Sequence, residues 1–210
     1  SLSANKTTLS GDFNGDDVIT GAGSTLSITN NTENALHVVI SAGNVGTARL
    51  DGFTITGGRA REIVGSNTQI QLENLETVRV DEGGGILIKN SSPTVINCIF
   101  IGNDAFSDAG MHMSNITTKI TVTNNTFSQN SSQVGSVGSE SSSDVVLKNL
   151  IINDNYASFR GGAIVSASTN LTIINSTIID NVANSGGNGI YSHSNSEIKL
   201  FNSLEVILLS

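Results

Sequence analysis

A repeat of about 26 residues is the feature that most constrains this chain, because repeated units of that size must pack on their neighbours in a regular array. From Gly83 onward, about five segments align, beginning GGGILIKN, AGMHMSN, GSVGSESS, GGAIVSAS and GNGIYSHS. Apolar residues recur in three columns: Ile86, Met111, Val137, Ile164 and Ile190; Val95, Val122, Leu147, Ile173 and Leu200; Phe100, Phe127, Ile152 and Ile178. Three such columns predict three short strands per repeat with inward-facing side chains.

Polar residues are as regular as the apolar ones. Two rows of asparagines recur at the same period: Asn97, Asn124, Asn149, Asn175 and Asn202; Asn103, Asn130, Asn155 and Asn181. Asparagine tolerates left-handed backbone, and its amide can hydrogen-bond an identical neighbour about 4.8 Å away in the next layer. Such ladders require parallel strands stacked in register. The sequence therefore predicts an all-β parallel β-helix with near-zero helix content.

The repeat divides the chain into segments of different regularity. Residues 83–210 form the regular coils, and residues 35–58 form an earlier coil with Asp51 near the first asparagine row. Residues 1–34 are predicted to be an N-terminal cap or first coil, and the charged residues 59–82 an insertion or an irregular coil. The apolar end at 204–209 departs from the repeat, so we expect truncation there or end-to-end self-association through the last coil.

Composition excludes several classes of function. The net charge is −8 with only 10 lysines and arginines, which argues against a nucleic-acid partner. No apolar run is long enough to span a membrane. Cys98 is the one cysteine, so it cannot form an intrachain disulfide and is expected in the core. No signal peptide is recognisable at Ser1, which predicts that any such segment lies outside this sequence.

The segments GGAIVSASTNLTIINSTIIDNVA and GGGILIKNSSPTVINCIFIGNDA carry a family resemblance. They resemble the right-handed parallel β-helix repeats of bacterial surfaces, including polymorphic outer-membrane protein repeats and secreted Bacteroidetes-type β-helix proteins. The resemblance implies export to the cell surface or the extracellular medium of a bacterium. It leads us to expect a structural or adhesive scaffold that contacts glycans, because the matching residues build coils and carry no chemistry.

The alternative is a polysaccharide lyase or glycoside hydrolase, since parallel β-helices also house these enzymes. The expected hydrolase motifs Asn-Thr-Asp, Gly-His-Gly and Arg-Ile-Lys are absent. A lyase needs a basic residue, and the candidates are Lys148, with Asp154 and Arg160 in the same coil, and Arg79 in the charged segment 59–82. We place the site of this alternative near 59–82.

Metal binding has one candidate, the triplet Asp12, Asn14 and Asp16. These residues match the first three ligand positions of a calcium loop, but Asp17 occupies the glycine position and Gly23 that of the bidentate acid. We therefore expect a turn, predict no cofactor, and keep calcium as an alternative. The three histidines, His37, His112 and His193, fall in different coil positions and predict no shared metal site; His112, between Met111 and Met113, is expected to face outward.

Overall fold

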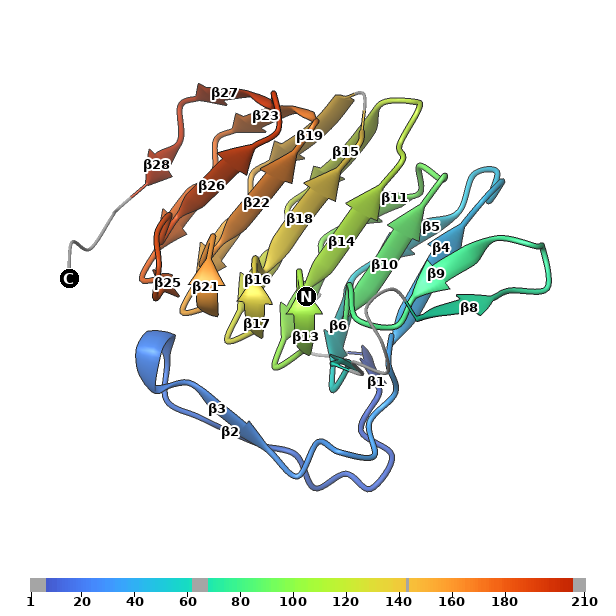
Figure 1. The fold of residues 1–210 in the computed structure, drawn as a ribbon, viewed down its shortest axis with the longest axis vertical. Coiled ribbons are helices and arrows are strands. Elements are labelled where there is room, and N and C mark those ends of the chain that lie inside the picture. The colour runs from blue at the N-terminus through green and yellow to red at the C-terminus, as the bar shows by residue number, and fades with distance from the viewer. Residues whose placement is uncertain (1–6, 62–67, 143, 206–210) are drawn as a thin grey trace.

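The chain winds into stacked coils whose strands form parallel β-sheets along the stack, in a computed structural model that describes residues 7–61, 68–142 and 144–205 (Figure 1). Within a coil the chain passes through four strands, and each strand pairs in parallel with its counterpart in the neighbouring coils. Each sheet is named below after its member in the coil that begins at Met111: β14, β15, β16 or β17.

The β14 sheet contains β4 (Val39–Ala42), β10 (Ile86–Lys89), β14 (Met111–Ser114), β18 (Val137–Glu140), β22 (Ile164–Ala167) and β26 (Ile190–His193). The β15 sheet contains β5 (Arg49–Asp51), β11 (Thr94–Ile96), β15 (Ile120–Thr123), β19 (Asp144–Lys148), β23 (Asn170–Ile174) and β27 (Glu197–Phe201). The β16 sheet contains β1 (Thr7–Ser10), β6 (Phe53–Thr56), β12 (Ile99–Ile101), β16 (Thr126–Ser128), β20 (Ile151–Asn153), β24 (Thr177–Ile179) and β28 (Leu204–Glu205). The β17 sheet contains β7 (Arg59–Ala60), β13 (Asp104–Ser107), β17 (Ser131–Val134), β21 (Tyr156–Arg160) and β25 (Val182–Ala183).

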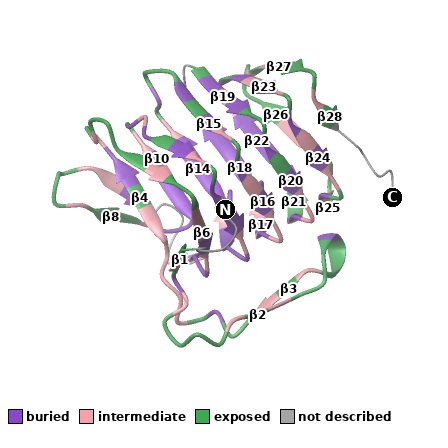
Figure 2. Cartoon of the chain, turned by 180° about the vertical axis from the view of Figure 1, so that it is seen from behind, coloured by how far each residue is buried: buried purple, intermediate pink, exposed green. Residues whose placement is uncertain are grey.

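The predicted apolar columns are the strand registers of three sheets. Ile86 pairs with Met111, Val95 with Val122, and Phe100 with Phe127, and the same pairing continues into the later coils. Most of these side chains are fully buried in one core that runs the length of the stack (Figure 2). Phe100 and Phe127 stack with ring centroids 4.7 Å apart. The all-β solenoid with a repeat of about 26 residues is thus confirmed.

The fourth sheet, of β17, has no large apolar column and was not predicted. Its inward positions hold small residues such as Ala105, Ser132 and Ala157, all at most 1% exposed. Side chains of this size leave little hydrophobic periodicity in the sequence, although the backbone hydrogen bonds continue in parallel.

The two asparagine rows occupy different environments. The row containing Asn97, Asn124 and Asn149 lies in exposed left-handed turns, where Asn124 donates to Asn97 (3.2 Å) and Asn149 to Asn124 (2.9 Å). The second row is buried: Asn103 donates to Asn130 (3.0 Å), Asn130 to Asn155 (3.0 Å) and Asn155 to Asn181 (2.8 Å). Buried amides of the second row also donate to backbone carbonyls, so they satisfy polar groups that water cannot reach.

Residues 11–34 run along the side of the solenoid, whereas the sequence placed residues 1–34 as a cap or first coil (Figure 1). This side segment contains the antiparallel pair β2 (Val18–Thr20) and β3 (Ser27–Thr29) and the 3-10 helix η1 (Gly23–Thr25). It contacts later coils: Gln129 donates to the carbonyl of Gly21 (2.9 Å), and Gly23 donates to the carbonyl of Asp154 (3.4 Å).

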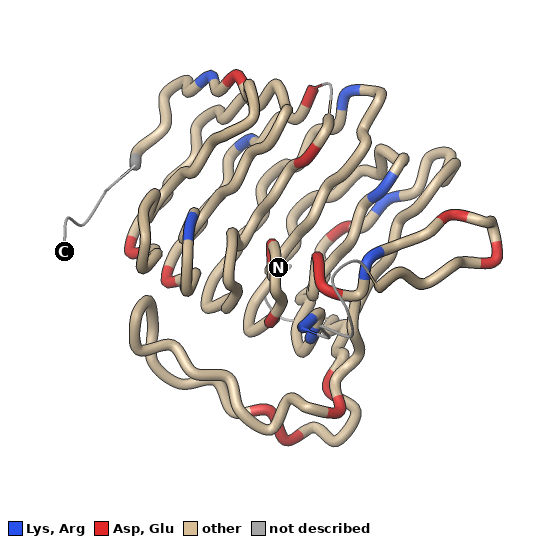
Figure 3. Tube along the Cα trace, viewed as in Figure 1, with Lys and Arg blue, Asp and Glu red and all other residues tan. Residues whose placement is uncertain are grey.

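Part of the charged segment 59–82 forms an antiparallel hairpin of β8 (Gln69–Gln71) and β9 (Thr77–Arg79) that projects from the stack. Acidic residues gather on this hairpin and on the side segment (Figure 3). Cys98 is buried, as expected. Most of the self-association prediction for 204–210 lies outside the described residues. In the described ranges, no helix has the length and hydropathy needed to cross a membrane.

Candidate functional site

The β8–β9 hairpin covers one end of the outer face of the β14 sheet. Outward positions of this sheet form two columns, the first running Ile40, Leu87, His112, Gly138, Val165 and Tyr191, and the second Ala42, Lys89, Ser114, Glu140, Ala167 and His193. Val78 of β9 is fully buried against Leu87 and Ala42. Lys89 donates from Nζ to the carbonyl of Thr77 (2.5 Å), which adds a polar contact beside this apolar one.

A groove lies on this face and begins at the hairpin. It consists of two adjoining pockets that share Glu82 and Glu140. The first is lined by Gln69, Arg79, Leu87, Lys89, Ser114 and Asn115, and the second by Ser107, Asp108, His112, Val134, Ser139, Val165, Ala167 and His193, each in addition to the shared pair. The groove therefore joins the hairpin to the last strand of the sheet, β26.

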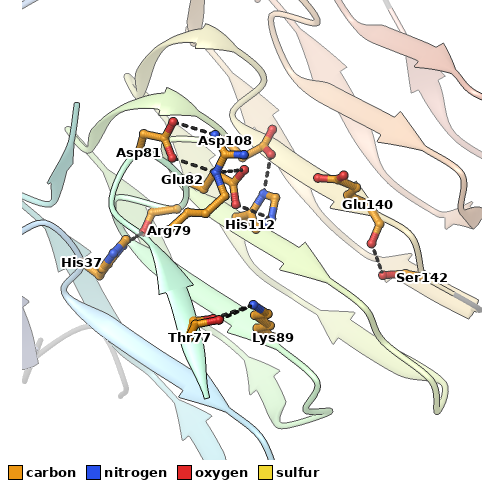
Figure 4. Close-up of polar contacts among 11 residues, drawn as sticks. His37, Thr77, Arg79, Asp81, Glu82, Lys89, Asp108, His112, Glu140 and Ser142 are labelled. Carbon is orange, nitrogen blue, oxygen red and sulfur yellow. Dashed lines mark hydrogen bonds and ion pairs between the residues drawn. The ribbon is translucent and has the colours of Figure 1, made fainter. Parts of the chain in front are cut away.

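His112 is the centre of a buried group of charged side chains at the base of the groove (Figure 4). Its side chain is 3% exposed, with Nδ1 2.8 Å from Asp108 Oδ2 and Nε2 3.2 Å from Glu82 Oε2. Arg79 lies on the far side of Glu82, with Nε 2.9 Å from Oε1, and also pairs with Asp81 at 2.8 Å. We call Arg79, Glu82, Asp108 and His112 the histidine cluster.

Asp108 occupies a space that exists because two neighbouring residues are glycines. A Cβ added to Gly138 would lie 1.9 Å from the Asp108 carboxylate, and one added to Gly135 would lie 2.2 Å from Oδ1. Asp108 itself has a left-handed backbone, with φ of 56°, at the turn that leads into β14. Because of this turn, the Asp108 carboxylate contacts the imidazole of His112, four residues later in the chain.

Glu82 is held in place by backbone pairing at the end of the charged segment. Glu82 forms a parallel bridge with Ser107, and the flanking bonds run from Ser107 N to Asp81 O and from Gly83 N to Ser107 O, both 3.0 Å. Its side chain is 11% exposed. Glu140 comes from β18, one coil beyond His112, and is exposed.

The carboxylates around His112 favour positive charge at this point. Burial alone would lower the pKa of His112, but the charge of Glu82 and the hydrogen bond to Asp108 outweigh it and raise that pKa to about 9. Burial raises the pKa of Glu82, and the charges of His112 and Arg79 offset this only in part. Burial likewise raises the pKa of Asp108.

The catalytic candidates from sequence do not converge. Arg79 belongs to the histidine cluster, but Lys148 is exposed on the β15 sheet. Asp154 follows β20 and accepts from Asn153, whereas Arg160 ends β21 and packs its guanidinium 4.9 Å from the ring centroid of Tyr191.

The calcium triplet forms a turn whose centre is Asp12. The Asp12 carboxylate accepts hydrogen bonds from the backbone N–H groups of Gly15 (2.7 Å), Asp17 (3.1 Å) and Asp16 (3.3 Å). Burial pushes the pKa of Asp12 upward, but these N–H groups together hold it below its ordinary value. Glu33 approaches Asp12 and Asp16, while Asn14 is exposed in the same turn.

Sequence reasoning missed Glu82, Asp108 and Glu140 as members of one site. His112 does face outward in the register, but it is buried, with the carboxylates of Glu82 and Asp108 against its ring. Two signals were present: the Asp108-x-x-x-His112 spacing, and glycine at position 138 in an outward column that otherwise carries larger side chains. Neither signal indicates that Glu82 and Glu140 reach the same point.

Comparison with known proteins identifies the class. The family model described as a right-handed beta helix region matches residues 63–204, more than half of the chain. The chain therefore belongs to the right-handed β-helix family. Neither the curated proteins nor the solved structures gave a match. The narrower resemblance to bacterial surface repeats stays a prediction.

Proposed function

We propose that this chain is a bacterial extracellular or cell-surface β-solenoid that binds a polysaccharide in the groove without cleaving it. The observation that carries the proposal is the continuity of the groove, whose two pockets adjoin at Glu82 and Glu140. An extended polymer fits a surface of this form better than a compact ligand does, because neither pocket encloses its occupant.

The lining of the groove supports a carbohydrate ligand. Gln69, Ser114 and Asn115 provide amide and hydroxyl groups that can donate and accept hydrogen bonds, as sugar hydroxyls do. At the other end, His193 lies in a tilted contact with Tyr191, with ring centroids 5.6 Å apart, next to the groove wall at Val165. An aromatic side chain there offers an apolar face for a sugar ring.

Catalysis is the second candidate, and one observation favours it. Glu82 and Glu140 place carboxylate oxygens within 4.8 Å of each other, close to the separation of about 5–5.5 Å used by retaining glycosidases. However, Glu82 Oε1 pairs with Arg79, and Oε2 faces His112. Because Arg79 pairs with Oε1 and Oε2 is directed at the buried His112, Glu82 is poorly placed to give a proton to a leaving group, and binding is the better-supported function.

The test combines binding and turnover on one panel of neutral and uronate-containing polysaccharides. Affinity electrophoresis and a glycan array measure binding by the unaltered chain, Gln69→Ala and Glu140→Gln. Lys148→Ala is the matched control, because Lys148 is exposed on a different sheet. We expect both groove variants to weaken binding and the control to match the unaltered chain.

Release of reducing ends or unsaturated uronates is measured in parallel. Turnover that disappears in Glu140→Gln would replace the binding proposal with the enzymatic one. Binding that none of the groove variants changes would overturn the assignment of the groove. Secretion is checked separately, by whether protease added to intact cells digests the chain.

A further inference from the structure

We propose that Glu82, His112 and Glu140 form a binding site for one divalent first-row metal ion, with zinc as the best-fitting ion. The argument depends on side-chain geometry at the base of the groove and is independent of whether the groove binds a glycan (Figure 4).

The orientation of His112 is that of a metal ligand. Nδ1 lies 2.8 Å from Asp108 Oδ2, so this nitrogen donates its proton to the carboxylate. Metal-binding histidines almost always make such a bond, because it fixes the tautomer and directs the other nitrogen at the ion. Nε2 is that other nitrogen here: it is buried, points toward Glu82 and has no hydrogen bond of acceptable geometry.

The spacing between Nε2 and Glu82 also fits a shared ion. Two ligand atoms at about 2.0–2.1 Å from one zinc ion lie roughly 2.8–3.0 Å apart at octahedral angles and roughly 3.3–3.4 Å apart at tetrahedral angles. Nε2 and Oε2 are 3.2 Å apart. Glu82 is fixed in this position by the pairing of Oε1 with Arg79 Nε (2.9 Å), which leaves Oε2 for the ion.

Glu140 supplies the third ligand. A carboxylate oxygen of Glu140, the Glu82 oxygen and the His112 nitrogen all lie within 4.8 Å of one another. Because Glu140 is exposed, its side chain is free to rotate inward by the remaining distance, which the buried Glu82 and His112 are not. The groove on either side of the pair leaves coordination positions open for water or a ligand.

The chemistry of these ligands selects the ion. An imidazole nitrogen favours zinc and other first-row metals, whereas calcium and magnesium prefer oxygen alone. The surrounding charge favours a cation, because Asp81, Glu82, Asp108 and Glu140 outnumber Arg79 around this point.

Isothermal titration of the chelator-treated chain with zinc chloride tests the proposal, with manganese, calcium and magnesium chlorides as comparison titrations. We expect one zinc per chain and weaker binding of calcium and magnesium. Glu140→Gln is expected to weaken zinc binding by roughly 10-fold or more, and Asp108→Asn, a change in a positioning residue, by roughly 10–100-fold. His193→Ala is the matched control, since it removes an exposed histidine of the same groove, and should leave zinc affinity unchanged.

Nitrogen NMR of the imidazoles in the unaltered chain gives a second readout that needs no folded variant. Zinc should shift the Nε2 resonance of His112 while Nδ1 keeps its proton. The proposal is overturned if no zinc binds, if zinc binding is lost in His193→Ala but kept in Glu140→Gln, if calcium binds as tightly as zinc, or if zinc leaves the His112 resonances unmoved.

Discussion

Asn155 offers the sharpest test of how the buried asparagine row stabilises the solenoid. Its side chain is 0% exposed and takes part in six hydrogen-bond contacts, three through each terminal atom, with the two N–H groups of Nδ2 shared among three acceptors. Oδ1 accepts from the backbone and side chain of Asn130 and from Ser136, and Nδ2 donates to Asn181 and to two backbone carbonyls. Alanine would remove all six without straining the backbone, since Asn155 is outside the left-handed region.

The expected loss follows from the partners left behind. The N–H of Asn130 and the hydroxyl of Ser136 are buried groups, and each buried polar group left without a partner costs about 1–3 kcal/mol. With the backbone carbonyls added, we expect Asn155→Ala to lower the free energy of unfolding by about 3–5 kcal/mol. Equilibrium unfolding in urea, compared at equal m-values, measures the change.

Asn124→Gly is the matched control from the exposed row. It removes ladder bonds to Asn97 and Asn149, but water can replace them, and glycine adopts the left-handed φ of 56° at this position without strain. We expect a loss below about 1 kcal/mol. The argument is that a ladder hydrogen bond contributes more to the free energy of unfolding when it is buried. Equal losses in the two variants, or a loss below about 1 kcal/mol for Asn155→Ala, would refute it.

Three further changes test other contacts. Phe127→Leu removes one ring of the stacked pair in the core, and should lower the free energy of unfolding by about 1–2 kcal/mol; an unchanged melting temperature contradicts this. Lys89→Met removes the Nζ contact to the hairpin, so hydrogen exchange should quicken in residues 69–79 while global stability changes by less than about 1 kcal/mol; uniform quickening contradicts a local role. Gly102→Ala places a Cβ 2.1 Å from Ile19 and strains a φ of +65°, so cleavage of residues 18–20 by protease should accelerate, and adding Ile19→Ala should relieve part of the effect; equal cleavage in all three chains contradicts the contact.

The periodic part of the fold was predictable because each coil repeats the same physical requirement. Inward positions such as Val95 and Val122 must be apolar in every coil, and turn positions such as Asn124 must tolerate left-handed backbone. These constraints recur at a fixed spacing and so are visible in one sequence. The β17 sheet escaped detection because inward residues such as Ala105 are too small to stand out.

For the candidate site, the sequence indicated a region of the chain but not the set of residues that meet there. The charge of residues 59–82 pointed to a region that contributes Arg79 and Glu82 to the histidine cluster. Glu140 and His112 come from neighbouring coils. Glu82 comes from a segment outside the repeat, so the repeat does not predict where it lies. The backbone pairing of Glu82 with Ser107 brings it to this point, and the periodic pattern does not specify that pairing.

The side segment has a consequence for the order of folding. Residues 11–34 are synthesised before the coils they contact, and the bond between Gln129 and Gly21 spans 108 positions. Contacts at this separation cannot form until the intervening coils exist, and closing so long a loop is slow. The side segment leaves the ribosome before these coils, yet it should attach only after they have formed.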